Sequence, residues 1–171
     1  MLKSSISKSK TQPHTTGHKT RVCRSCDKRK AITRYELKNN RWRSRECMDC
    51  RSAGRRKRIS NSPYLYISNL YTQLSHRRKK THQFNITREY LYALYERQKG
   101  ICVYSGIGLT NIKDGTGYHL TNISIDRIDN NKGYVEGNIA LVSLACNMMK
   151  YTLDLKDMKN WCKMITQHNE D

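Results

Sequence analysis

Two side chains with hard oxygen donors, Asp126 and Asn147, stand in the C-terminal half of the chain. Carboxylate and amide oxygens are ligands that Mg²⁺ and Mn²⁺ prefer, and this pair is unsuited to a closed zinc site. If the fold brings the two side chains together, they can hold one divalent cation.

Four of the seven cysteines form two CxxC pairs, Cys23 with Cys26 and Cys47 with Cys50, and 20 residues separate the pairs. Four thiolates satisfy a tetrahedral Zn²⁺ and leave no position for a substrate, so the spacing predicts a structural zinc site. An odd cysteine count without a secretion signal favours metal ligation in a reducing setting over disulfides. A segment this short has little core of its own, so zinc would supply much of its folding free energy.

The elements that must position Asp126 and Asn147 follow from the pattern between Ile123 and Lys150. Residues 123–128 alternate as a short strand, and Asn130-Asn131-Lys132-Gly133 is a turn sequence in which Asn and Gly tolerate positive φ. Residues 139–142 form a second apolar strand, and residues 144–150 suit a helix. We therefore expect a ββα unit with Asp126 on its first strand and Asn147 on its helix.

The remaining segments predict helices around this unit. The break at residues 61–63 starts a helix over residues 64–80. Thr87 caps a second helix that Gly100 terminates, and residues 101–106 would form a hairpin that leads into the ββα unit. Asp154 caps a last helix over 155–168, whose apolar stripe should cover the ββα unit.

The fold class is therefore α+β, and the chain divides into four parts. These are a disordered basic arm (1–20), a zinc-binding basic module with four cysteine ligands (21–60), a helical connector (61–100) and a ββα domain with the last helix (101–171).

The charge is concentrated at the N-terminal end. Residues 1–60 contain 19 Lys and Arg against 4 Asp and Glu, a net +15 of the total +19. Such an excess favours a polyanion, with nucleic acid ahead of an anionic membrane, and no apolar run approaches the roughly 18–20 residues that span a bilayer. The zinc module is then either a clamp on the DNA backbone or merely a cap on the fold. The candidate contacts are Arg24, Lys28, Arg29, Lys30, Arg41, Arg43, Arg45, Arg55, Arg56, Lys57, Arg58 and Lys150.

Between Ile123 and Lys150 the sequence ISIDRIDNNKGYVEGNIALVSLACNMMK resembles the HNH, or His-Me finger, endonucleases, in the forms common in phage and mobile-element proteins. Asp126 matches the metal-ligand Asp of that family, Asn138 the Asn that braces the loop, and Asn147 the second metal ligand. The resemblance implies a catalytic Mg²⁺ or Mn²⁺ beside the structural Zn²⁺, a DNA partner, and hydrolysis that leaves a 5′-phosphate and a 3′-hydroxyl. It also implies an intracellular protein, in the cytoplasm of a bacterial host if a phage encodes it.

The segment that begins Q-x-G-x-C-x-x-S-G resembles the entry segment of the family, which often carries a CxxC pair, with a second pair at the helix. Here each pair has lost one thiol, at Ser105 and at Ser143. The sequence therefore predicts no metal at this place, and Cys102 and Cys146 act as small buried residues.

Arg127 stands where the family places its general-base His. A guanidinium stays protonated and cannot accept a proton from water, although it can bind a phosphate oxygen bidentately. The candidate bases are His119, whose pKa is ordinarily near neutrality, and Asp129, which could instead cap the Asn130–Gly133 turn. Lys150 could neutralise phosphate charge or be a surface lysine.

Three hypotheses stay open at this point. The chain could be an active endonuclease that lacks the usual His, or a DNA-binding protein that keeps the fold without catalysis, for which Arg127 is the argument. It could also bind structured RNA or branched DNA through the basic arm and zinc module. The sequence leaves the oligomeric state and the recognition site undetermined.

Overall fold

The structure is a computed structural model, and it describes residues 19–38, 41–42 and 44–169. The basic arm predicted for residues 1–20 therefore lies, apart from its last two residues, outside the described residues. The chain divides into two compact units, residues 1–52 and residues 53–171. No helix among the described residues has the length and apolar character needed to cross a membrane. The four-part division stays a prediction.

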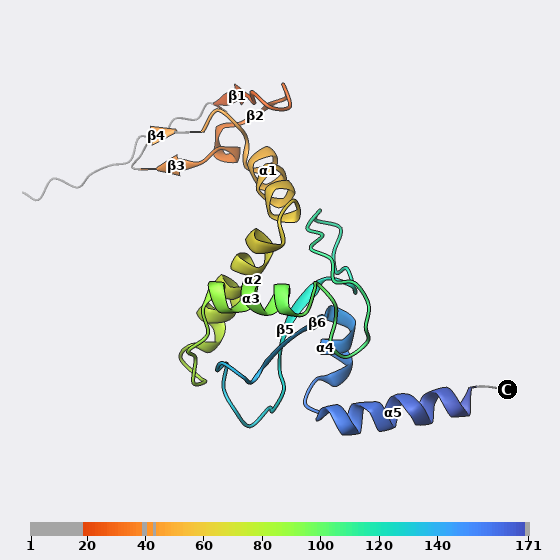
Figure 1. Cartoon of the computed structure of the whole chain (residues 1–171). Helices are drawn as coiled ribbons and strands as arrows, with labels where there is room; N and C mark the ends of the chain where they lie inside the picture. Colours follow the sequence, from red (N-terminus) through yellow and green to blue (C-terminus); the bar gives the residue numbers. More distant parts are fainter. Residues whose placement is uncertain (1–18, 39–40, 43, 170–171) are drawn as a thin grey trace, which may run out of the picture. The chain divides into compact units, whose positions relative to one another are not determined.

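The N-terminal unit contains two small hairpins (Figure 1). Strand β1 (Thr20–Val22) pairs antiparallel with β2 (Arg29–Ala31), and β3 (Leu37–Lys38) pairs with β4 (Arg41–Trp42). A 3₁₀ turn, η1 (Ile32–Arg34), connects the hairpins, and helix α1 (Met48–Ser60) starts in this unit. The buried residues are Cys23, Tyr35 and Cys47, so two of the predicted zinc ligands make up most of the core.

Helix α2 (Pro63–Arg78) begins at the predicted break over residues 61–63, and α3 (Arg88–Arg97) begins at its predicted cap, Thr87. Ser62 is the N-cap of α2, with the proline in the first turn of the helix. A cap oxygen accepts a backbone N–H that the helix itself leaves without a partner, which fixes where the helix starts. Gly100 follows α3 with φ of +66°, a conformation that glycine adopts without steric cost.

The predicted ββα unit is present. Strand β5 (Ile123–Arg127) pairs antiparallel with β6 (Ile139–Ser143), so that Asp126 lies opposite Ala140. Helix α4 (Leu144–Lys150) follows directly and packs against both strands, while α2 and α3 contact the same hairpin (Figure 1). A single apolar core joins the helices to the hairpin; its fully buried members include Ile67, Leu91 and Leu141.

The last helix, α5 (Leu155–His168), starts at Asp154 as predicted, but its apolar stripe does not cover the ββα unit. Met158 is the buried residue of this helix, whereas Trp161 and Ile165 are 56% and 60% exposed. The helix diverges from the hairpin after its first turns (Figure 1). The 3.6-residue pattern correctly predicted an amphipathic helix, but the pattern alone does not determine what that helix packs against.

The turn after β5 also differs from its prediction. None of the residues from Asn130 to Gly133 has positive φ. Instead, Gly133 is needed because the chain passes close to Gln83: a Cβ on Gly133 would meet the carbonyl oxygen of Gln83 and lie 2.9 Å from its carbonyl carbon. That oxygen accepts a hydrogen bond of 2.8 Å from the backbone N–H of Tyr134, which fixes the loop to the segment before α3.

We therefore expect Gly133→Ala to destabilise the second unit, by about 1–3 kcal/mol, the usual range for an overpacked site. Gly108→Ala is the matched control, because a Cβ there has nothing within 4 Å. Chemical denaturation monitored by circular dichroism measures both. Equal stability of the two variants would contradict the close contact with Gln83.

Candidate functional site

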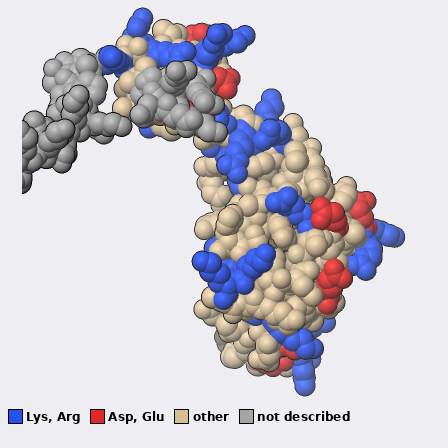
Figure 2. Space-filling view, turned by 90° about the vertical axis from the view of Figure 1, so that its left-hand side faces the viewer, with Lys and Arg blue, Asp and Glu red and all other residues tan. Residues whose placement is uncertain are grey.

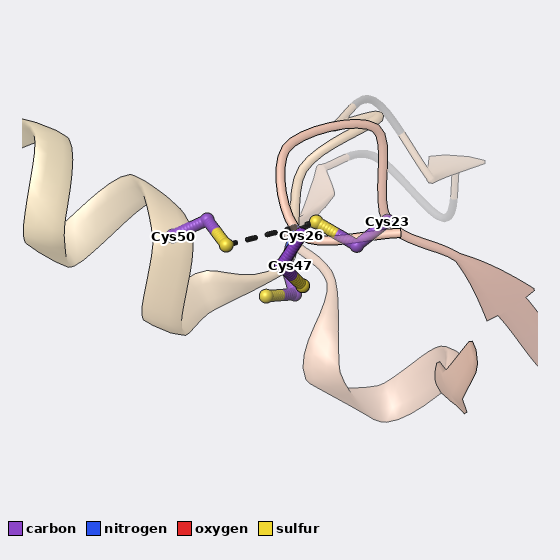
Figure 3. A group of neighbouring side chains, drawn as sticks. All are labelled: Cys23, Cys26, Cys47 and Cys50. Atoms are coloured by element: carbon purple, nitrogen blue, oxygen red, sulfur yellow. Dashed lines mark hydrogen bonds between the residues drawn. The ribbon is translucent and has the colours of Figure 1, made fainter. Parts of the chain in front are cut away.

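The four cysteines of the two CxxC pairs converge in the N-terminal unit, and their side chains point toward one another (Figure 3). All four sulfur atoms lie within 4.8 Å of one another, and Cys23 Sγ is 3.8 Å from Cys50 Sγ. Tetrahedral Zn²⁺ with Zn–S bonds of about 2.3 Å requires sulfur atoms about 3.8 Å apart. The donor set and the spacing therefore fit the predicted zinc ion.

Hydrogen bonds within the cluster lower the pKa of two of the four thiols, Cys23 and Cys47, whereas the hydrogen bond with Cys47 does most to raise the pKa of Cys50, to about 12. The backbone N–H of Cys47 donates to Cys23 Sγ at 3.2 Å, and this bond does most to lower the pKa of Cys23, to about 6. The pKa of Cys47 is also lowered, mainly by the backbone N–H of Cys50. Lys30 Nζ lies 3.3 Å from Cys47 Sγ and donates to Asp49 at 2.8 Å. Thiolates are the form that binds zinc, so these bonds prepare the site for the metal.

Several basic residues of this unit are already engaged. Lys30 belongs to the cysteine cluster, Arg34 pairs with Asp49, and Arg51 pairs with Glu36.

Other candidate DNA contacts remain exposed. Arg24, Lys28 and Arg45 are exposed and have no acidic partner among the described residues, and the backbone N–H of Arg24 donates to the carbonyl of Arg45 at 3.0 Å. Arg43 lies outside the described residues, and of Arg41 only its place in β4 is described. Figure 2 shows Lys and Arg as separate patches on the visible face of each unit.

The ββα unit places Asp126 at the centre of a polar cluster. Its carboxylate is buried, and Oδ2 accepts a hydrogen bond of 2.7 Å from the hydroxyl of Tyr104. Lys150 Nζ lies 3.2 Å from Oδ2 and 3.4 Å from Oδ1. The side chain of Lys150 is completely buried, so it is not the surface lysine that the sequence allowed. It also donates to the carbonyl of Arg127 at 2.9 Å.

The side chain amide of Asn147, on α4, contacts the same strand, β5. Its Nδ2 donates to the hydroxyl of Ser124 at 2.6 Å and is 3.4 Å from the carbonyl of Ile125. Residues two apart on a strand share a face, so Ser124 and Asp126 both point toward α4. These bonds leave the amide oxygen of Asn147 with no partner within the described part of the chain.

These donors fit a divalent cation in type. A carboxylate has about four acceptor sites, and Asp126 Oδ1 has only the long contact with Lys150. The amide oxygen of Asn147 would add a second ligand, and Mg²⁺ commonly completes its shell with water and phosphate oxygens. Lys150 already places one positive charge beside Asp126, however, so a divalent ion would have to share the carboxylate with that ammonium.

Arg127 is directed differently from its expected role. Its Nη1 donates to the carbonyls of Asn130 and Lys132, each at 3.0 Å, and its guanidinium lies 5.4 Å from the centre of the Tyr134 ring. These contacts anchor the loop after β5. These bonds make the guanidinium a support of its own loop; they use Nη1 alone, so the bidentate phosphate contact expected from sequence stays a prediction.

The polar residues of the loop hold its shape. The Asn138 amide donates to the carbonyls of Asp129 and Gly133, each at 3.0 Å, and its oxygen accepts the Asp129 N–H at 2.9 Å. Asp129 in turn accepts the backbone N–H of Asn131, which does most to lower its pKa. Asp129 therefore caps the turn, which was the alternative to its being a base.

The other proposed base, His119, lies in the loop between residues 113 and 121. Its Nε2 is 3.1 Å from Asp114 Oδ1, and its hydrogen bonds do not reach the Asp126 cluster. Sequence reasoning missed Tyr104, because nothing in the spacing of residues 101–106 indicates that one side chain there reaches Asp126. Burial, and then the bond to Asp126, raise the pKa of Tyr104, so its hydroxyl stays protonated.

Cys102 is completely buried, as expected, and Cys146 is half-buried. Burial acts to raise the pKa of Cys102, but hydrogen bonds from Ser105 and from nearby backbone N–H groups outweigh it and lower the pKa to about 7. The Cys102 side chain fills a small site in the core beside Ser143, whose backbone nitrogen lies 3.2 Å from the Cys102 sulfur.

No family model matches the sequence, and no curated protein matches it. Among solved structures, the rare-cutting HNH restriction endonuclease PacI aligns with 86% of this chain and 94% of its own chain. The aligned residues are 20% identical, and the TM-score is 0.42. A likeness this distant assigns neither fold nor activity, and the residue contacts above stand without it.

For the zinc module we expect one zinc ion per chain. Cys47→Ser removes one thiolate and should release the metal and unfold the N-terminal unit, because the ligands are most of its core. Cys162→Ser is the matched control, since Cys162 lies in α5 and outside the cysteine cluster. Elemental analysis of the purified proteins measures this; a wild-type chain without zinc, or with two zinc ions, would contradict it.

For Arg127 we expect a structural effect. Arg127→Ala should lower the free energy of unfolding by about 1.5–3 kcal/mol, since it removes hydrogen bonds from a charged donor to two loop carbonyls. The salt dependence of DNA binding should remain that of the wild type. If Arg127→Ala instead keeps the wild-type stability and shows a flatter salt dependence of DNA binding, Arg127 contacts a phosphate, and the loop-support role is contradicted.

Proposed function

We propose that this protein binds DNA and hydrolyses its phosphodiester bonds at the ββα unit, with Asp126 and Asn147 as ligands of one divalent cation. The basic excess of residues 1–60 supports a polyanionic partner. The cysteine cluster supports a zinc-stabilised module that carries part of this charge.

The observation that carries the proposal is the polar cluster of Asp126, Lys150, Tyr104 and Asn147. Burying an ion pair costs several kcal/mol of desolvation per ion, and apolar residues of similar volume usually stabilise a core as well or better. Here the pair joins a strand to a helix in a unit whose other buried residues are mostly apolar. A chemical role accounts for a cluster that stability alone does not require.

Each residue would have a distinct part. The cation, when bound, would polarise the phosphate and stabilise the leaving oxygen. Asp126 and Asn147 would supply its protein ligands. Tyr104 orients Asp126 through Oδ2, so that Oδ1 is the oxygen with more free acceptor capacity. Lys150 pairs with the carboxylate and brings a positive charge beside the place where a phosphate would bind.

The second candidate is a DNA-binding protein that keeps this unit without cleavage. Two observations favour it: the ammonium of Lys150 already neutralises Asp126, and Arg127, where a base would stand, is committed to the loop. The imidazole of His119 bonds to Asp114 and supplies no base to the cluster. On this hypothesis the Asp126 cluster is a structural remnant and the basic residues perform the function.

A plasmid-nicking assay with Mg²⁺ or Mn²⁺ separates the two candidates. We expect the wild type to nick supercoiled DNA. Asp126→Asn and Asn147→Ala should each slow nicking by at least about 100-fold, because loss of a residue that only supports a metal ligand already costs up to about 100-fold in activity. Asparagine is preferable to alanine at Asp126, because alanine would leave Lys150 buried without a partner, at a cost of about 3–5 kcal/mol.

DNA affinity, measured in parallel by fluorescence anisotropy, should change little in either variant. Ser105→Ala is a control that removes a hydroxyl from the unit without touching Asp126. The nuclease proposal would be overturned if the wild type bound DNA but left linear, supercoiled, branched and single-stranded DNA intact with both ions. The second candidate, a DNA-binding protein without cleavage, would then remain.

A further inference from the structure

A second polar site lies between α1 and α2, in the second unit. Its lining comes from one face of each helix: Arg55, Arg58, Ile59, Leu65, Ser68, Asn69 and Thr72. Arg58 and Ile59 follow Arg55 by three and four positions, and the four residues of α2 repeat the same spacing, which places each set on one helix face. The cavity volume is about 210 Å³, below the roughly 300–1,000 Å³ of clefts for drug-sized ligands. We call it the α1–α2 pocket; its size suits a phosphate group with part of a sugar.

The lining has the chemistry of an anion site. Arg55 and Arg58 each present a planar set of donors that matches phosphate oxygens bidentately. Neither the Ser68 hydroxyl nor the Asn69 amide hydrogen-bonds to another described residue, so both can donate to a ligand. The buried Ile59 makes one side of the pocket apolar, while Arg55 and Arg58 are exposed and within reach of a ligand.

A third guanidinium reaches the end of the pocket. Arg88 Nη2 lies 3.5 Å from the hydroxyl of Thr72, which itself donates to the carbonyl of Ser68 at 2.9 Å. Arg88 is held there by the ring of Tyr71, 5.2 Å from its guanidinium. The pocket is therefore approached by positive charge from α1 and from α3.

These cations have no compensating acid in the part of the chain that the structure describes. None of the ion pairs there includes Arg55, Arg58 or Arg88. Lys113 is a further basic residue near Arg55. Burial is the main cause that lowers the pKa of Lys113, and repulsion from the positive charge of Arg55 lowers it further. Its backbone N–H is fixed to the hydroxyl of Ser60 at 2.6 Å, next to the pocket. Gathered like charges repel one another, and a bound anion relieves that repulsion.

We propose that the α1–α2 pocket binds one backbone phosphate of duplex DNA, with Arg55 and Arg58 as the ionic contacts and Ser68 and Asn69 as neutral donors. This rests on the proposed action on DNA, and it assigns a contact point distinct from the Asp126 cluster. Such a phosphate contact fixes the position of the duplex on the protein and carries no sequence information.

The test uses the zinc-loaded full chain and a fluorescent duplex of arbitrary sequence, titrated at several salt concentrations. Arg55→Ala/Arg58→Ala should weaken binding by at least about 10-fold and lower the slope of log K against log salt by about 0.9, the value for one phosphate. Lys156→Ala/Lys159→Ala, which removes the same charge from exposed positions on α5, should leave the slope unchanged.

Two single variants distinguish a built site from a general field of charge. Asn69→Ala should weaken binding about 10-fold with no change in slope, because it removes a neutral donor to a charged group. Arg58→Lys keeps the positive charge but loses the bidentate donor geometry of the guanidinium. DNA binding should therefore weaken, while the slope of log K against log salt stays unchanged. Circular dichroism and zinc content check that each variant is folded.

The pocket proposal would be overturned if Arg55→Ala/Arg58→Ala kept the wild-type DNA affinity and salt slope. It would also be overturned if Lys156→Ala/Lys159→Ala lost as much affinity and slope as the arginine variant. In both cases the proposed action on DNA would stand. Tighter binding of an RNA duplex of the same length through the same arginines would overturn the assignment to DNA. A wild type with no salt-dependent DNA binding would overturn the proposed function itself, and the pocket with it.

Discussion

The buried pair of Asp126 and Lys150 is the interaction that positions the candidate site of the second unit. It joins β5 to the last residue of α4, and Lys150 reaches further, to the carbonyl of Arg127 at the end of the strand. Both side chains are 6% exposed or less, so each charge relies on the other and on nearby dipoles for its stability. Tyr104 adds the segment after α3 to the same carboxylate. The pair therefore fixes three chain segments around the residue that the proposed chemistry needs.

The N-terminal unit depends in a similar way on a few polar groups. Its core is the cluster of four cysteines together with Tyr35, whose hydroxyl donates to the carbonyl of Arg21 at 2.8 Å. With so little apolar surface to bury, we expect this unit to depend on metal coordination for its stability. Lys30 and Asp49 are already engaged beside the cysteine cluster, which leaves Arg24, Lys28 and Arg45 as exposed charges available to a polyanion.

Local signals in the sequence were sufficient for the elements. The alternation of residues 123–127, the break at residues 61–63, the caps at Thr87 and Asp154, and the CxxC spacing each reflect interactions within a few residues or one ion. Side-chain directions could not be predicted in this way. Whether Arg127 points to a phosphate or to its own loop depends on where Asn130 and Lys132 place their carbonyls, and the burial of Lys150 depends on how α4 packs. The exposed stripe of α5 is a further case: periodicity shows that an apolar face exists and does not show what it contacts.

The central claim is that Asp126 and Asn147 hold a divalent cation despite the ammonium of Lys150. Electron paramagnetic resonance of Mn²⁺, titrated into the zinc-loaded chain with bound duplex DNA, measures this directly. We expect one bound Mn²⁺ per chain, whose binding is lost in Asp126→Asn and weakened in Asn147→Ala. Absence of bound Mn²⁺ in the wild type, or the same bound Mn²⁺ in Asp126→Asn, would contradict it.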